Sequence, residues 1–269
     1  MPHRCALSLF FVFGDVVERS TRPCLESISR RSELNVQQPP RSEVGRFGWL
    51  VVAALLLLPA LAGAEDAALD PCAKRAVEAV QKRYEAVVDL QARFEQTSRS
   101  VALGGPGAET RSSGEVVFAK PGRMRWSYSE PEPSLVVSNG TWLWIYDPGA
   151  REAQKMSVAG GMMSGTALQF LLGEAKIERD FRVEPRACGA QEAELILWPR
   201  EPATYERLAI RVDPRSGDLR ATEVVDLLGN VTLVAFDGVK TNVGAAPELF
   251  TFEPPEGVEV IELSPLPAP

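Results

Sequence analysis

The sequence predicts a mainly β protein of the α+β class, with one helix followed by about ten short strands in an antiparallel sheet large enough to curl. Three observations lead to this prediction. Apolar residues recur at three- and four-residue steps between Ala73 and Val87. Apolar and polar residues alternate in short segments after a glycine-rich break at 104–107. Turn sequences such as Asn139-Gly140 separate these segments.

The elements follow in chain order. Asp70 supplies a side-chain cap and Pro71 a first helical residue, so a helix of four to five turns begins there. The alternation starts near Asp89, and turns at 216–218 and 229–230 separate the last three strands. The expected strands are 90–95, 114–119, 123–128, 134–138, 141–146, 179–183, 193–198, 205–212, 219–227 and 231–239.

Residues 44–64 are expected to form a signal peptide. A basic stretch at Arg46 precedes an apolar run from Trp49 to Leu58, and Ala62-Gly63-Ala64 supplies the small residues that signal peptidase recognises. The run is too short to span ~30 Å of hydrocarbon as a helix. We therefore expect cleavage after Ala64 and a soluble, exported single domain of residues 65–269, with an uncleaved membrane anchor as the alternative.

Residues 1–43 precede this signal and show no sustained periodicity. Two interpretations remain open for them. Translation begins at Val44, or the segment is a genuine, disordered extension. In either case the segment is excluded from the prediction of the fold.

The composition excludes several classes of function. The net charge of −7 makes nucleic acid a poor partner. The chain has one histidine, His3, which lies ahead of the predicted signal, so histidine-dependent nucleophiles and metal sites are excluded. No phosphate-binding loop is present, and no Asp/Glu pair differs from ordinary solvated surface. We expect a monomeric binding protein with no enzymatic activity, no cofactor and no metal.

Two cysteines, Cys72 and Cys188, remain after the predicted cleavage. In an exported protein an even pair favours one disulfide, although two separate buried thiols would leave the same sequence pattern. Cys72 lies eight residues beyond Ala64, so lipid modification at the cleavage site is not expected.

The segment 160–173 interrupts the strand pattern with a short helix framed by glycines, and Met162 and Met163 stand at its entrance. Glycine permits movement and methionine adapts to varied apolar partners, so a hinged lid is one interpretation. A buried helix that completes the core is the other.

Several segments together resemble the outer-membrane lipoprotein carrier family of the LolA type. They are GEVVFAKPGRMRWSY at 114–128, Glu130-Pro131, LVVSNGTWLWIYDP at 135–148, LQARFEQ at 90–96 and FTFEPPEGV at 250–258. The resemblance keeps these segments in order and covers nearly all of residues 72–260.

The resemblance implies an incomplete, strongly curled antiparallel barrel, a half-barrel that encloses an apolar cavity under a helical lid. It also implies a periplasmic carrier that accepts lipoproteins from an inner-membrane ABC transporter and delivers them to an outer-membrane receptor. Each aromatic residue in the set could equally be plain core. The candidate acyl-binding residues are Phe94, Phe118, Met124, Trp126, Tyr128, Trp142, Trp144, Tyr146, Met162, Met163, Leu168, Phe170 and Leu171.

Lys120 occupies the position of the basic residue, typically arginine, with which the family holds its lid shut. Lysine keeps the charge but lacks the planar fork of donors, so Arg123 or Arg125 is an alternative latch. Glu65 stands where an anchored receptor would need a lipidated cysteine, and residues 65–269 leave no room for the second domain of a stress-signalling regulator. A general lipid or lipopeptide carrier of the same fold remains the alternative function.

Overall fold

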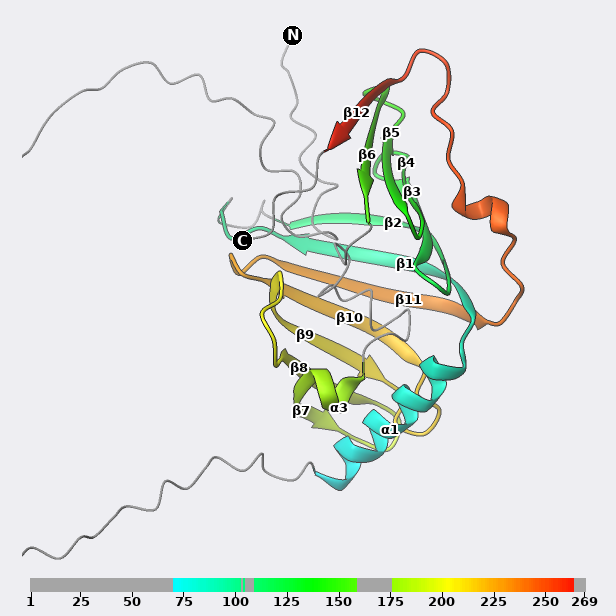
Figure 1. The fold of residues 1–269 in the computed structure, drawn as a ribbon. Helices are drawn as coiled ribbons and strands as arrows, with labels where there is room; N and C mark the ends of the chain where they lie inside the picture. Colours follow the sequence, from blue (N-terminus) through cyan, green and yellow to red (C-terminus); the bar gives the residue numbers. More distant parts are fainter. Residues whose placement is uncertain (1–69, 103, 105–108, 159–175, 264–269) are drawn as a thin grey trace, which may run out of the picture. The chain divides into compact units, whose positions relative to one another are not determined.

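The computed structural model describes residues 70–102, 104, 109–158 and 176–263, and twelve strands among them form one open sheet (Figure 1). The strand order is β12-β6-β5-β4-β3-β2-β1-β11-β10-β9-β8-β7, so β12 and β7 are the two edges. The helical segments are α1 (Pro71–Ala86), α3 (Ile177–Asp180) and the 3₁₀ turn η3 (Pro247–Phe250). The strands are β1 (Asp89–Arg99), β2 (Glu109–Ala119), β3 (Arg123–Glu130), β4 (Ser134–Asn139), β5 (Trp142–Asp147), β6 (Glu152–Ser157), β7 (Phe181–Cys188), β8 (Ala193–Pro199), β9 (Tyr205–Val212), β10 (Leu219–Asp226), β11 (Val231–Thr241) and β12 (Glu259–Leu263).

The prediction of a mainly β protein with few helices is confirmed. Neighbours in sequence also pair in space within each half of the sheet, from β1 to β6 and from β7 to β11. The two halves join where β1 pairs with β11, for example Phe94 with Phe236. This long-range pair makes one continuous sheet from two meanders.

The expectation of a wholly antiparallel sheet is wrong at one edge, because β12 pairs with β6 in parallel. The chain leaves β11 at Asn242, whose amide donates to the Asp89 carbonyl. Residues 242–258, which we call the strap, then connect β11 to β12 and include Gly257 near their end. Gly257 has a φ of +78°, a backbone conformation that glycine adopts without strain. The chain turns there and enters β12 in the same direction as β6.

One predicted strand is misplaced, and two strands were not predicted. The interval 179–183 was expected to be a strand, but Arg179 and Asp180 belong to α3 and the strand begins at Phe181. The Asp180 carboxylate accepts from the Lys176 amide at 2.7 Å, which satisfies an amide at the start of this helical turn. Strands β6 and β12 were not predicted at all.

Helix α1 begins as predicted. The Asp70 carboxylate accepts from the Cys72 and Ala73 amides at 2.8 and 3.3 Å, and Pro71 follows the cap. The helix buries one stripe of side chains on the sheet: Ala73, Ala76, Val77, Val80 and Tyr84. Its first turn is joined to the end of β7 by a disulfide between Cys72 and Cys188, whose Cα atoms lie 6.1 Å apart.

Gly217, in the turn between β9 and β10, lets the sheet approach α1 closely. A Cβ atom at this position would lie 2.3 Å from the Ala79 carbonyl oxygen, and the φ of +74° also favours glycine. The phenol of Tyr84 then accepts a hydrogen bond from the Leu219 amide at 3.3 Å.

We call the face of the sheet that packs with α1 the inner face and the opposite one the outer face. Within the described ranges, no helix is both long and apolar enough to cross a bilayer. The predicted signal peptide at 44–64 and the predicted lid at 160–173, with Met162, Met163, Leu168, Phe170 and Leu171, lie outside these ranges.

Candidate functional site

The inner face of β1 to β6 carries long rows of apolar side chains. One row runs through Trp126 and the next through Met124, with each residue opposite its neighbour on the adjacent strand. Because paired residues share a face, each row forms a continuous band across the strands. The rows are Val116, Trp126, Val136, Ile145, Gln154 and Ile261, and Leu90, Phe118, Met124, Ser138, Leu143, Met156 and Leu263.

Aromatic rings cluster at the centre of this inner face. The Phe94 ring meets Trp126 edge to face at 4.7 Å and Tyr128 at 5.0 Å, and Phe118 meets Trp126 at 5.7 Å. Phe236 of β11 lies 6.5 Å from Trp126 and was missing from the sequence-based candidates. The alternation in 231–239 could have revealed it, because Val234 and Phe236 share the core face.

Gly114 allows two of these rings to meet across an intervening strand. It is the register partner of both Phe94 and Tyr128. A Cβ atom at Gly114 would lie 2.0 Å from the Ser127 carbonyl oxygen, so no other residue fits without moving the backbone. With no side chain between them, the Phe94 and Tyr128 rings come into contact.

A few polar groups interrupt the apolar inner face. The Tyr128 hydroxyl donates to Gln96 Oε1 at 3.1 Å, and Gln96 Nε2 donates to Ser98 Oγ at 3.1 Å. Burial raises the pKa of the Tyr128 phenol, so the hydroxyl stays protonated and remains a donor.

Three further polar atoms on this face are buried and lack a hydrogen-bond partner within the part of the chain that the structure describes. They are Trp126 Nε1, Ser134 Oγ and Gln154 Oε1. An apolar surface with a few polar groups suits a ligand that is mostly hydrocarbon and has a polar end.

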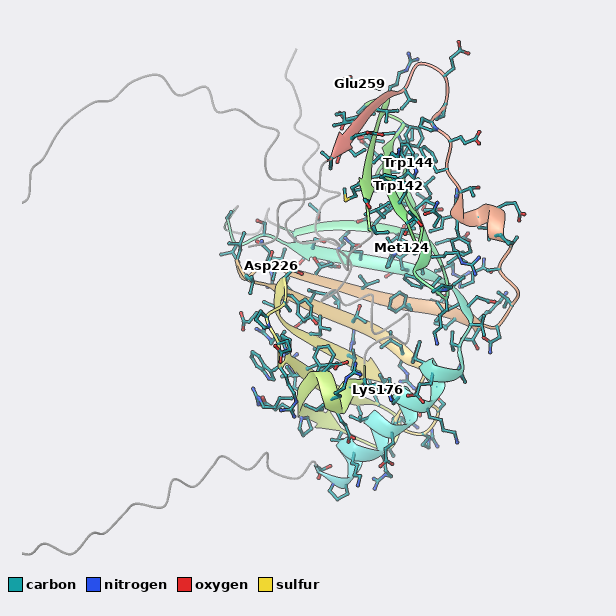
Figure 2. All side chains as sticks on the ribbon, in the orientation of Figure 1. Met124, Trp142, Trp144, Lys176, Asp226 and Glu259 are labelled. Carbon is teal, nitrogen blue, oxygen red and sulfur yellow. A yellow bond between two sulfur atoms is a disulfide. The ribbon has the colours of Figure 1, made fainter. Side chains whose placement is uncertain are left out.

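The remaining aromatic candidates lie on the outer face. Trp144 pairs with Val137 and Tyr146 with Leu135, both one residue out of step with the inner rows. Phe252 of the strap packs against the Trp144 and Tyr146 rings at 5.5 and 5.1 Å. Trp142 and Trp144 therefore do not share a face with Met124, and all three are labelled in Figure 2.

Basic residues attach the strap to the outer face. The Arg123 guanidinium lies 5.2 Å from the centroid of the buried Phe250 ring. Arg125 Nη1 donates to the Leu249 carbonyl at 3.1 Å. Beyond the strap, Lys155 of β6 lies 4.3 Å from the Trp142 ring and pairs with Glu262 of β12 at 3.0 Å. Both alternative latch residues, Arg123 and Arg125, thus contact the strap.

Lys120, the matched latch position, contacts the end of α1. Its ammonium group donates to the Tyr84 carbonyl at 2.7 Å and to the Glu85 carbonyl at 3.3 Å. A cation at the C-terminal end of a helix satisfies its last carbonyl groups and interacts favourably with the helix dipole. A contact with 160–173 falls outside the described ranges and stays a prediction.

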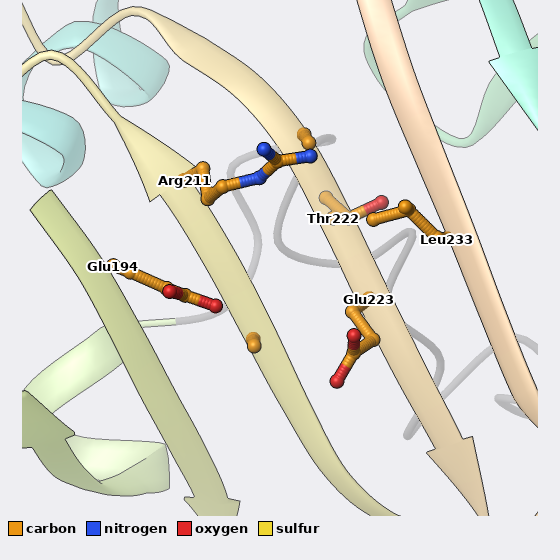
Figure 3. A pocket seen from close by; sticks show the side chains of 7 residues that line it. Glu194, Arg211, Thr222, Glu223 and Leu233 are labelled. Carbon is orange, nitrogen blue, oxygen red and sulfur yellow. The ribbon is translucent and has the colours of Figure 1, made fainter. Parts of the chain in front are cut away.

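A separate depression of about 250 Å³ lies on the outer face of β8 to β11 (Figure 3). Glu194, Arg211, Glu223 and Leu233 line it from register positions that alternate with the core residues. Because Glu194, Arg211 and Glu223 contribute charged groups to this lining, the depression is less suited to hydrocarbon than the inner face.

The chain is therefore a mainly β protein built on one open sheet, with a buried cluster of aromatic rings on its inner face. A family model described as outer membrane lipoprotein carrier protein LolA matches residues 85–253. The outer-membrane lipoprotein carrier protein of Alkalilimnicola ehrlichii is 34% identical over 182 residues, covering 66% of this chain and 80% of the relative. The same-named protein of Azotobacter vinelandii is 30% identical over 210 residues, covering 77% and 97%. The chain belongs to the outer-membrane lipoprotein carrier (LolA) family.

Among solved structures, a LolA superfamily protein from Nitrosomonas europaea aligns with 13% identity and a TM-score of 0.39, covering 67% of this chain and 97% of that one.

Proposed function

We propose that this protein carries the acyl chains of lipoproteins on the inner face of β1 to β6. The observation that carries the proposal is the buried ring cluster of Phe94, Phe118, Trp126 and Tyr128 at the centre of a mostly aliphatic inner face. Family membership supports lipoproteins as the cargo.

The energetics favour partial shelter of the acyl chains. Burial of a sixteen-carbon chain releases roughly 12 kcal/mol at ~0.8 kcal/mol per CH₂. Three fully buried chains would exceed the ~18–21 kcal/mol at which noncovalent affinity saturates. A carrier that must release its cargo therefore covers the chains incompletely or spends part of the binding energy on opening its own structure.

The unpaired polar atoms of the inner face can form hydrogen bonds with the polar end of the cargo. An N-acylated, diacylglyceryl-modified cysteine bears ester and amide carbonyl groups that accept hydrogen bonds. Trp126 Nε1 is a donor without an acceptor within the described ranges, and we assign it to such a carbonyl group. Gaining this bond on loading offsets part of the cost of desolvating the ester.

The remaining assignments belong to the same proposal. The signal peptide at 44–64 directs export to the periplasm, and residues 65–269 act there as a monomer. An inner-membrane ABC transporter supplies the cargo and an outer-membrane receptor accepts it. Residues 160–173 cover the inner face, and Lys120 holds this cover shut.

Mass spectrometry of material that co-purifies with the periplasmic protein tests the proposal. We expect triacylated lipoproteins in amounts comparable to the carrier. Free phospholipid without lipoprotein would support the general lipid carrier and overturn the assignment of the cargo.

A further inference from the structure

Three large aliphatic side chains project into solvent at one end of the sheet. Leu227 and Leu228 form the turn between β10 and β11 and are 63% and 66% exposed, while Val101 follows β1 and is 61% exposed. Figure 2 labels Asp226 at the end of β10, where this turn begins. We call these three residues the apolar tip.

The two turns that form the apolar tip are tied together. The Val101 amide donates to Asn230 Oδ1 at 2.9 Å. A Cβ atom at Gly229 would lie 3.5 Å from Val101 Cγ2, which is ordinary packing distance. The three side chains therefore belong to one local surface, although more than a hundred residues separate Val101 from the two leucines in sequence.

Three backbone amides of the turn between β10 and β11 are hydrogen-bonded within the turn itself. Asp226 Oδ1 accepts from the Leu228 and Asn230 amides, both at 2.8 Å, and the Asp226 carbonyl accepts from Gly229 at 3.1 Å. The second carboxylate oxygen accepts from Asn230 Nδ2 at 2.7 Å. The Asp226 carboxylate next to the leucines is thus directed into the turn, and these amides need no water.

We infer that the apolar tip inserts into the surface of a lipid bilayer. Amides that enter the apolar boundary of a membrane are costly unless they are already hydrogen-bonded, and the amides of Leu228, Gly229 and Asn230 are. Three aliphatic side chains are too few for a stable protein interface, which buries about 800 Å² on each partner. They suffice for weak, reversible membrane contact of the kind that shallow insertion provides.

The net negative charge of the protein indicates that its binding to a membrane is hydrophobic and not electrostatic. With 36 acidic and 29 basic residues, the chain is repelled by anionic lipid, so attraction must come from the aliphatic side chains. Binding to neutral vesicles is therefore at least as strong as binding to anionic vesicles, and added salt does not weaken it.

Co-sedimentation of the purified protein with phosphatidylcholine vesicles tests this inference. We expect the parent protein to partition measurably onto the vesicles. In the variant Leu227→Ser/Leu228→Ser the partition coefficient should fall by about tenfold or more for each leucine replaced. Val88→Ser is the matched control, because Val88 is an equally exposed valine, 60%, at the opposite end of β1. It should leave partitioning unchanged, and all three proteins should have the same unfolding midpoint.

Three results would overturn the inference: no partitioning of the parent protein, equal partitioning of the double variant, or loss of binding in about 0.5 M salt, which marks electrostatic attraction. The inference goes beyond the proposed cargo and fails separately from it. A double variant that no longer binds vesicles but still co-purifies with lipoprotein keeps both proposals, whereas vesicle binding without any lipoprotein cargo keeps only this one.

Discussion

Trp126 and Trp144 lie on opposite faces of the same sheet, although only β4 separates their strands. Trp126 pairs with Val136 and faces the core, whereas Trp144 pairs with Val137 and meets Phe252 of the strap. Under the proposed function, Trp126 therefore has a binding role and Trp144 a structural one. A ligand on the inner face is expected to contact Trp126 and not Trp144.

The first prediction uses this pair. Replacing Trp126 by Phe keeps an aromatic ring but removes an indole N–H that has no acceptor within the described residues. We expect weaker loading of lipoprotein, with stability changed by less than about 2 kcal/mol because lost packing and a removed unpaired donor oppose each other. Trp144→Phe is the control and should load normally. Equal loading by both variants in a transfer assay would refute the assigned role of the Trp126 N–H.

The second prediction concerns Asp89, a buried carboxylate that anchors the strap. It accepts from the amides of Val243, Gly244 and Ala245 at 2.7, 3.0 and 3.3 Å. Asp89→Ala leaves these amides without their acceptor and should lower the free energy of unfolding by about 2–4 kcal/mol. It should also speed proteolysis near 243–246.

Glu95→Ala is the matched control for this second prediction, because it removes an exposed carboxylate from the same strand. Denaturant unfolding should give nearly the parent value for it. An Asp89→Ala variant that is as stable as Glu95→Ala would show that the contacts of the strap with the outer face hold it without Asp89.

The third prediction concerns the disulfide between Cys72 and Cys188, which closes a loop with a sequence separation of 116 residues. The loop-entropy model gives an upper bound of about 5 kcal/mol for such a loop. We expect the double variant Cys72→Ser/Cys188→Ser to unfold at lower denaturant, mainly through release of the first turn of α1. Two reactive thiols at these positions in the unreduced, denatured parent would contradict the bridge.

The fourth prediction concerns alkaline pH. Burial raises the pKa of Tyr84 and of Tyr205 to about 12, and it raises that of Tyr128 as well. A phenol whose pKa is raised by folding stabilises the fold fully below its unfolded pKa near 10 and loses this contribution as pH rises through the folded value. Stability should therefore fall above about pH 10.

Ultraviolet titration of tyrosinate checks the fourth prediction. Ionisation of these three residues should coincide with the loss of tertiary structure followed by near-ultraviolet circular dichroism. Ionisation that is complete near pH 10 in the folded protein would show that the three phenols are accessible to water.

The strands that carry their own alternation were predictable from sequence. Tyr205–Val212 matches its expected bounds, and Asn139-Gly140 marks the turn between β4 and β5. β6 (Glu152–Ser157) is short and mostly polar, and β12 (Glu259–Leu263) follows a proline-rich stretch, so neither shows a strand period of its own. Pairing with neighbouring strands stabilises both, and that information is not local.

The faces of the sheet were harder to assign. Residues 141–146 are apolar at every position after Thr141, so alternation does not reveal which side faces the core. The register with β4 and the contact of Phe252 with Tyr146 show which side of β5 faces the core. The register depends on the neighbouring strand, and the contact joins segments that are distant in sequence. The pairing of Phe94 with Phe236 is likewise long-range, so alternation in 231–239 could mark Phe236 as a core residue but could not place it beside Phe94.

Photo-crosslinking of a lipoprotein with a diazirine at the end of its acyl chain tests the central claim most directly. After irradiation of the loaded carrier, peptide mass spectrometry should place the adducts on inner-face residues such as Phe118, Trp126 and Leu143. Adducts confined to Trp144, Tyr146 and the strap would contradict the assignment of the inner face as the acyl-binding surface.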